Sequence, residues 1–168
     1  KGSQKGRYSV IGLKPDFIWE CKNGECKVTE NGKRNHNYKF GSKNPLVNLK
    51  KIIKNNKIKI PSILPSISCG LFGYLGYEMI QYFEKVEMTK TDTLDLPESI
   101  FLRPSLTLVF DNVNDKLFVT KIVSPSNLTA KSAFNKAKNE INKLINSINK
   151  PLNNKNLNLH NLNQKVNI

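Results

Sequence analysis

An Asn-Gly dipeptide at positions 23 and 24 constrains the fold more than any other feature of this sequence. It lies between two strand-like segments, residues 16–21 and 26–30, which carry Phe, Ile, Trp and Val. Asn and Gly both accept the positive φ angles of a type I′ turn, the tight turn that joins two antiparallel strands. The sequence therefore predicts a β-hairpin here, and with it an antiparallel sheet.

Other segments are also typical of strands. Residues 7–13 are apolar and β-branched and precede Pro15, which predicts a strand that ends in a turn. Residues 105–110 and 116–123 flank the polar stretch 111–115. This arrangement predicts a second hairpin with a longer loop.

Three segments are expected to be helical. Asn44 followed by Pro45 combines a good N-cap with a proline at the first helical position, and the helix should end near Asn55. A short helix over 77–84 should follow a glycine-rich segment. The longest helix should be capped by Asn127 or Thr129 and ended by Pro151. Its expected apolar stripe is Ala133, Phe134, Ala137, Ile141, Leu144, Ile145 and Ile148.

These elements predict an α+β fold with antiparallel β-sheets, hairpins and a few packed helices over residues 1–150. From residue 152 the chain is rich in Asn with isolated Leu residues, so we interpret 151–168 as a linker. The chain also begins with Lys1 rather than Met. We therefore expect it to be a piece of a longer protein.

The net charge of +14 and a pI near 9.8 raise the possibility of nucleic-acid binding. Only three of the 27 basic residues are Arg, however, and nucleic-acid surfaces usually favour the planar fork of Arg. The Lys residues accompany abundant Asn and Ile, whose codons are also A/T-rich. We favour genome composition as the cause, and a small basic nucleic-acid-binding module remains as an alternative.

The sequence offers no set of residues for catalysis or metal binding. Four residues lie between Cys21 and Cys26, which is outside common zinc spacing, and with Cys69 these cysteines make an odd number. Free thiols in a reducing compartment are expected. No apolar run is long enough to span a bilayer or to act as a signal peptide, so we expect a cytoplasmic protein.

Two segments could still bind a ligand. Glycines recur at 70, 73 and 76 within the aromatic-rich stretch 69–78, which favours tight packing at a strand-to-helix turn but leaves a ligand contact possible. Arg7 lies at the mouth of a predicted strand, with Ser9 close by. Its guanidinium could hold a carboxylate with two hydrogen bonds, or it could be an exposed charge at a strand end.

Three segments together resemble the N-terminal region of anthranilate synthase component I, in order and in spacing. They are Lys-Gly-Arg-Tyr-Ser-Val-Ile-Gly-Leu-Lys-Pro-Asp at 5–16, Ser-Cys-Gly-Leu-Phe-Gly-Tyr-Leu-Gly-Tyr-Glu-Met at 68–79, and Arg-Pro at 103–104 running into Val-Phe-Asp-Asn at 109–112. The helix that begins at Pro45 fits as well. The resemblance covers residues 1–150.

The resemblance implies the N-terminal lobe of a larger two-lobed α/β enzyme, a lyase of tryptophan biosynthesis. The whole enzyme would convert chorismate and ammonia to anthranilate and pyruvate with Mg²⁺, and a glutamine amidotransferase subunit would supply the ammonia. Catalytic and metal residues would belong to an absent C-terminal chorismate-binding domain, so this piece alone should be inactive and bind no cofactor.

The family's N-terminal domain also helps to form a tryptophan feedback site. The resemblance nominates Arg7, Tyr8 and Ser9 as the wall of that pocket or its support. The nearest rival is the related para-aminobenzoate synthase component I, which uses the same scaffold. We prefer the anthranilate enzyme because the Gly-Arg-Tyr-Ser-Val-Ile-Gly and Arg-Pro segments resemble it more.

Overall fold

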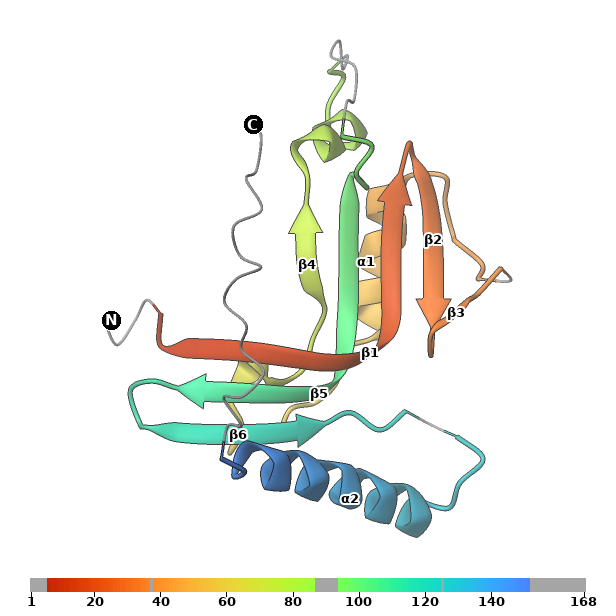
Figure 1. Ribbon diagram of the computed structural model, residues 1–168. Coiled ribbons are helices and arrows are strands. Elements are labelled where there is room, and N and C mark those ends of the chain that lie inside the picture. Colours follow the sequence, from red (N-terminus) through yellow and green to blue (C-terminus); the bar gives the residue numbers. More distant parts are fainter. Residues whose placement is uncertain (1–5, 37, 87–93, 125, 152–168) are drawn as a thin grey trace, which may run out of the picture.

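The computed structural model describes residues 6–36, 38–86, 94–124 and 126–151. Within these ranges the strands form one antiparallel sheet in the order β3-β2-β1-β5-β4, and β6 also pairs with β5 (Figure 1). The strands are β1 (Tyr8–Lys22), β2 (Glu25–Glu30), β3 (Lys33–Arg34), β4 (Phe72–Leu75), β5 (Ser99–Asp111) and β6 (Lys116–Lys121). The helices are α1 (Pro45–Asn55), the 3₁₀ helices η1 (Ser66–Ser68) and η2 (Tyr77–Tyr82), and α2 (Ala130–Ile148). The α+β, antiparallel class expected from the sequence is confirmed.

The two longest strands, β1 and β5, pair along their whole length and change direction together halfway (Figure 1). At the change Pro15 lies opposite Pro104, the register shifts between Pro15 and Phe17, and Lys14 has a φ of 49°. Neither proline can donate a ladder hydrogen bond, so the pairing is interrupted there. The prediction that a strand ends in a turn at Pro15 was wrong, because the strand bends and continues to Lys22.

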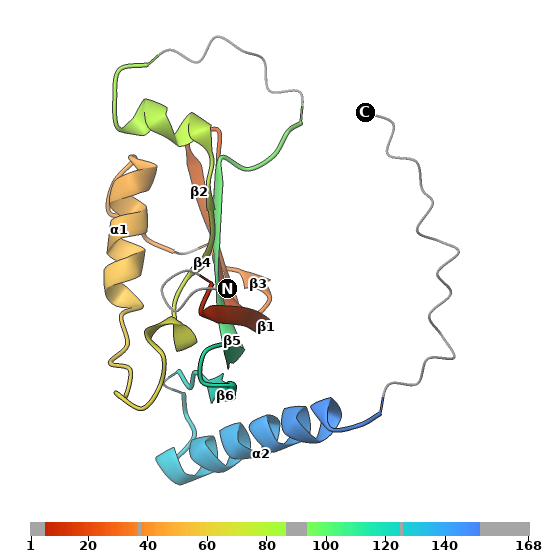
Figure 2. The same ribbon diagram turned by 90° about the vertical axis from the view of Figure 1, so that its left-hand side faces the viewer.

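The bend divides the sheet into two parts with different neighbours. One part contains the second half of β1 and the first half of β5. There these strands are flanked by β2 and β4, and α1 covers this part of the sheet (Figure 2). The main core lies there, between the sheet, α1 and η2. Its buried members are Phe17, Trp19, Cys21, Val28, Leu46, Leu49, Ile52 and Met79.

The hairpin and cap signals of the sequence are confirmed. Asn23 and Gly24 have φ angles of 50° and 74°, as a type I′ turn requires. Asn44 caps α1 by accepting a hydrogen bond from the backbone N–H of Leu46 at 2.9 Å, and Pro45 occupies the first turn. The hairpin of β5 and β6 is also present, although β5 begins at Ser99, well before the expected residue 105.

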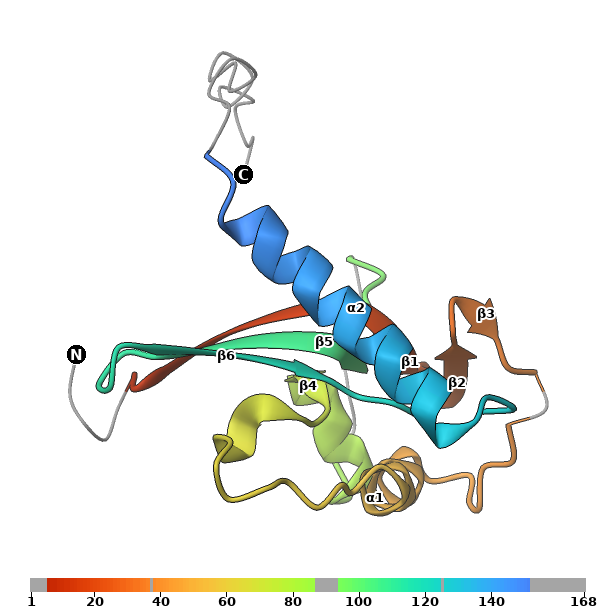
Figure 3. The ribbon, with the colours of Figure 1, turned by 90° about the horizontal axis from the view of Figure 1, so that it is seen from below.

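The helix α2 lies across the other part of the sheet and contacts β6 (Figure 3). Thr129 is its N-cap and accepts a hydrogen bond from the backbone N–H of Ser132 at 3.3 Å. Among its residues Ala137 is buried, whereas Phe134 is 65% exposed. The expected apolar stripe is therefore only partly covered by the sheet.

Two further expectations concern the middle and the end of the chain. The helix expected over 77–84 is a 3₁₀ helix that ends at Tyr82. The proposed linker lies outside the described residues from position 152 onward. No helix among the described residues is both long and apolar enough to cross a membrane.

Candidate functional site

Arg7 holds an internal carboxylate with two hydrogen bonds. Its Nε donates to Oδ1 of Asp111 at 3.1 Å and its Nη2 donates to Oδ2 at 2.8 Å. The two residues come together because β1 begins beside the end of β5, where Tyr8 pairs with Asp111. Asp111 is 3% exposed and Arg7 is 37% exposed. The Arg-carboxylate contact considered from the sequence therefore exists, with a partner inside the chain.

Asp111 is also the hydrogen-bond centre of the turn between β5 and β6. Its Oδ1 accepts from the backbone N–H groups of Val113 and Asn114, and its Oδ2 accepts from the side-chain amide of Asn114 at 2.8 Å. The Arg7 guanidinium is the main cause of a pKa for Asp111 well below its usual value, and Asn114 and the turn backbone lower it further. The same pair raises the pKa of Arg7. Both groups are therefore charged at neutral pH.

Tyr8 and Ser9, the other two residues nominated for the effector pocket, lie beside this ion pair. The Arg7 guanidinium carbon lies 4.9 Å from the centre of the Tyr8 ring, a cation–π distance. The Ser9 hydroxyl accepts a hydrogen bond from the side-chain amide of Asn112 at 3.2 Å. Arg7, Tyr8 and Ser9 thus form one connected cluster where β1 begins and β5 ends.

A second arginine, Arg103, is surrounded by partners at the bend of the sheet. Arg103 donates from Nε to Asp16 Oδ1 at 2.8 Å, from Nη1 to the side-chain oxygen of Asn56, and lies 5.7 Å from the centre of the Phe17 ring. Arg103 and Asp16 are 17% and 15% exposed. The guanidinium therefore ties β5 to β1 and to the end of α1.

An open cavity of about 470 Å³ lies beside Arg103. Its wall is mainly apolar and comes from the end of α1, the loop after it, the segment before β4, and β5. The lining side chains include Ile53, Ile58, Leu71 and Phe101. Its polar lining includes Arg103 and Asn56, which already bond one another, and Lys57.

The glycine-rich segment permits close contact between two backbones, which confirms the packing interpretation at two of its three glycines. A Cβ on Gly73 would lie 2.8 Å from the Cα of Phe101 on the neighbouring strand. A Cβ on Gly76 would lie 2.6 Å from the carbonyl oxygen of Glu98. At Gly70 a Cβ would meet no atom within 4 Å, so that position does not require glycine for space.

Sequence reasoning missed the acidic partners of these sites. Asp111, Asp16 and Glu98 each meet residues that are distant in the chain. Asp111 had a detectable signal, because an Asp at the start of a turn is typical of an Asx turn, in which its side chain accepts from the backbone N–H two residues on. For Asp16 and Glu98 only the folded chain supplies the neighbours.

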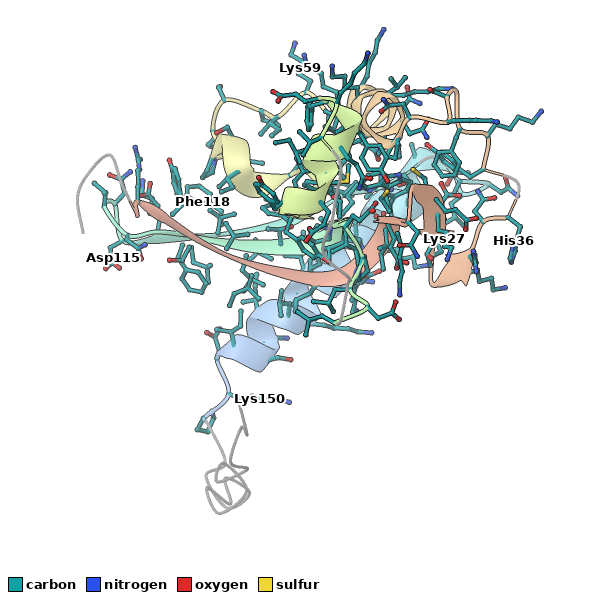
Figure 4. All side chains as sticks on the ribbon, turned by 90° about the horizontal axis from the view of Figure 1, so that it is seen from above. Lys27, His36, Lys59, Asp115, Phe118 and Lys150 are labelled. Atoms are coloured by element: carbon teal, nitrogen blue, oxygen red, sulfur yellow. The ribbon has the colours of Figure 1, made fainter. Side chains whose placement is uncertain are left out.

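The described residues contain no group of three or more His, Cys, Asp and Glu side chains arranged to hold a metal ion. The three cysteines are free thiols. His36 lies at the outer edge of the molecule near β3, and Lys59 and Lys150 lie on opposite sides of it (Figure 4). These two lysines do not share one surface.

The chain is similar to anthranilate synthase component 1 from several bacteria. It is 36% identical to the protein of Cereibacter sphaeroides over 141 residues, which are 81% of this chain and 28% of that relative. It is 31% identical over 132 residues to that of Neisseria meningitidis serogroup C, covering 74% of this chain and 26% of the relative. The chain thus spans less than a third of the length of these curated relatives.

Among solved structures, the chain resembles anthranilate synthase component I from Streptococcus pneumoniae TIGR4. The TM-score is 0.65 at 24% sequence identity, and the match covers 92% of this chain and 32% of that structure. This likeness establishes the shared fold. No protein-family model matches the chain.

Proposed function

The chain belongs to the anthranilate synthase component I family, and we propose that it is the N-terminal, non-catalytic domain of such an enzyme. The observation that carries the proposal is the similarity over 81% of this chain, matched to only 28% of the relative. The rest of the relative's length is available for a catalytic domain.

Exposed apolar side chains support a role in packing against a second domain. Tyr77 and Phe83, at the two ends of η2, are 74% and 61% exposed, and Phe134 on α2 is also mostly uncovered. Large apolar side chains in water cost free energy that burial against a partner would recover. We propose that the partner is a chorismate-binding domain.

The whole protein, in this proposal, converts chorismate and ammonia to anthranilate and pyruvate. A glutamine amidotransferase subunit supplies the ammonia, and Mg²⁺ is held by the chorismate-binding domain, where it steadies a carboxylate of the substrate. The residues of this chain contribute no reacting group. Their part is to support the catalytic domain and to sense tryptophan.

Arg7, Tyr8 and Ser9 are our candidates for the support of the tryptophan pocket. Asp111 already occupies Nε and Nη2 of Arg7, so the guanidinium is fixed in place rather than free to follow a ligand. A wall held in one position completes the tryptophan pocket in only one arrangement of the two domains, so tryptophan binds that arrangement better. Such differential binding is the physical requirement for feedback inhibition.

A chimera tests the proposal. The matched 141-residue region of the Cereibacter sphaeroides enzyme is replaced by this chain, and anthranilate formation from chorismate and ammonia is followed by fluorescence, with the unaltered enzyme as positive control. We expect the chimera to make anthranilate and to be inhibited by tryptophan. This chain alone should make none.

A matched pair of variants locates the effect within the chimera. Arg7→Ala should raise the tryptophan concentration needed for half inhibition, whereas Arg34→Ala, on the exposed strand β3, should leave it unchanged. Anthranilate formation by the isolated chain would refute the non-catalytic role. An active chimera that ignores tryptophan would refute the regulatory role and favour the para-aminobenzoate enzyme instead.

A further inference from the structure

Two cysteines face each other across the first hairpin. Cys21 on β1 is directly paired with Cys26 on β2, one position beyond the pair Lys22 and Glu25 that closes the two-residue Asn-Gly turn. Both thiols are free and belong to the core-facing side of the hairpin. The sequence spacing alone predicted only free thiols.

The position of this pair in the ladder suits a disulfide. In a hairpin with a two-residue turn, the residues that flank the turn exchange both backbone hydrogen bonds, so the next pair is a non-hydrogen-bonded one. Directly opposite residues of that kind have Cα atoms about 4.5 Å apart and side chains that lie close together. A disulfide spans Cα separations of about 4.4–6.8 Å, so the separation typical of such a pair falls within the range that a disulfide can bridge.

The two thiols have different surroundings. Cys21 is fully buried, and its thiol can donate to the sulfur of Cys26 or to Oε2 of Glu98, which lies 3.4 Å away. Cys26 is only partly buried and accepts a hydrogen bond from the Asn48 side-chain amide at 3.6 Å. The donated hydrogen bonds from Cys21 and Asn48 lower the pKa of Cys26, while donation and burial raise the pKa of Cys21.

Glu98 holds the buried thiol in place. Besides Cys21, its carboxylate accepts from the Tyr82 hydroxyl at 2.9 Å, and from the Gln81 amide and the Gly24 backbone N–H, both at 3.3 Å. These donors come from η2 and from the hairpin turn. When the Cys21 proton is lost, Glu98 keeps its three other hydrogen bonds.

We propose that Cys21 and Cys26 are a redox modification site, at which a low-molecular-weight disulfide such as glutathione disulfide reversibly oxidises the pair to a cross-strand disulfide. The thiolate of Cys26 attacks one sulfur of glutathione disulfide, whose S–S bond breaks and releases one glutathione thiolate. Cys21 then attacks the Cys26 sulfur of the mixed disulfide as a thiolate, the bond between Cys26 and glutathione breaks, and the released glutathione thiolate takes up the proton that Cys21 has lost. Two protein thiols are oxidised by two electrons, and one glutathione disulfide is reduced to two glutathione thiols.

The test incubates the folded chain in glutathione buffers of graded redox poise, quenches with acid and alkylates the remaining thiols. Trypsin cleaves after Lys22, between the two cysteines, so a disulfide joins two peptides that otherwise separate. We expect the joined peptides as the buffer becomes oxidising, and their loss on return to reducing buffer. Trp19, the only Trp, lies next to the pair on the same face, so its fluorescence should fall on oxidation.

Three single variants make the assignment specific. Cys21→Ser should accumulate a glutathione adduct on Cys26, because the second step has lost its attacking thiol. Cys26→Ser should form neither product. Cys69→Ser, the control, should behave like the parent chain. Cysteines 21 and 26 that stay fully alkylatable at every poise, or that react only in urea, would overturn the proposal, as would a disulfide involving Cys69.

Discussion

Replacing Gly73 by Ala should be one of the most damaging small changes in this chain. Gly73 lies in β4 opposite Phe101 of β5. An added Cβ would come within 2.8 Å of both the carbonyl carbon of Ile100 and the Cα of Phe101. Both are backbone atoms of β5, which pairs with β1, β4 and β6, so no flexible side chain can move to make room.

The expected cost follows from that geometry. Overpacking a core usually costs about 1–3 kcal/mol, and the upper end applies when the obstructing atoms are rigid. We therefore expect Gly73→Ala to lower the free energy of unfolding by about 3 kcal/mol. With a urea dependence of about 1.5 kcal/mol per molar, the midpoint of unfolding should fall by about 2 M.

Gly70→Ala is the matched control within the same segment. An added Cβ there meets no atom within 4 Å, and its φ is not in the left-handed region, so we expect a change within about 0.5 kcal/mol. Urea unfolding of both variants can be followed by the fluorescence of Trp19, the only Trp, which is fully buried. Gly73→Ala with the same midpoint as the parent chain would refute the close-approach argument.

Three other changes test separate parts of the structure. Asn44→Ala removes the α1 cap and should cost about 1 kcal/mol in urea unfolding; an unchanged midpoint would contradict the capping role. Since the pKa of Asp111 is lower in the folded chain than in the unfolded one, its stabilisation is present above about pH 4 and is lost as the pH falls further. Asp111→Asn should therefore be less stable at neutral pH and lose less stability in acid; identical acid profiles would refute this. Arg103→Lys cannot bond Asp16 and Asn56 with one planar fork and should cost roughly 1–2 kcal/mol, measured by thermal or urea unfolding; a neutral result would show that these bonds are dispensable.

The elements that sequence reasoning predicted well are those fixed by neighbours in the chain. The type I′ turn needs only Asn23 and Gly24, and the start of α1 needs only Asn44 and Pro45. The conformational preference of proline gave a wrong prediction at Pro15, where the strand was expected to end in a turn. The opposing Pro104, 89 positions later, lets both strands lose hydrogen bonds at the same place and bend together.

By itself, the sequence determined the class of the fold, its hairpins and capped helices, and the family resemblance. Each of these depends on short runs of adjacent residues. Only the tertiary structure decided which charges meet and which thiols face each other. Arg7 bonds Asp111, and Cys21 bonds Glu98, because the pairing of β1 with β5 brings together residues that are distant in the sequence. Such partners depend on the register of the sheet, which is set by the packing of the whole core and not by any local pattern.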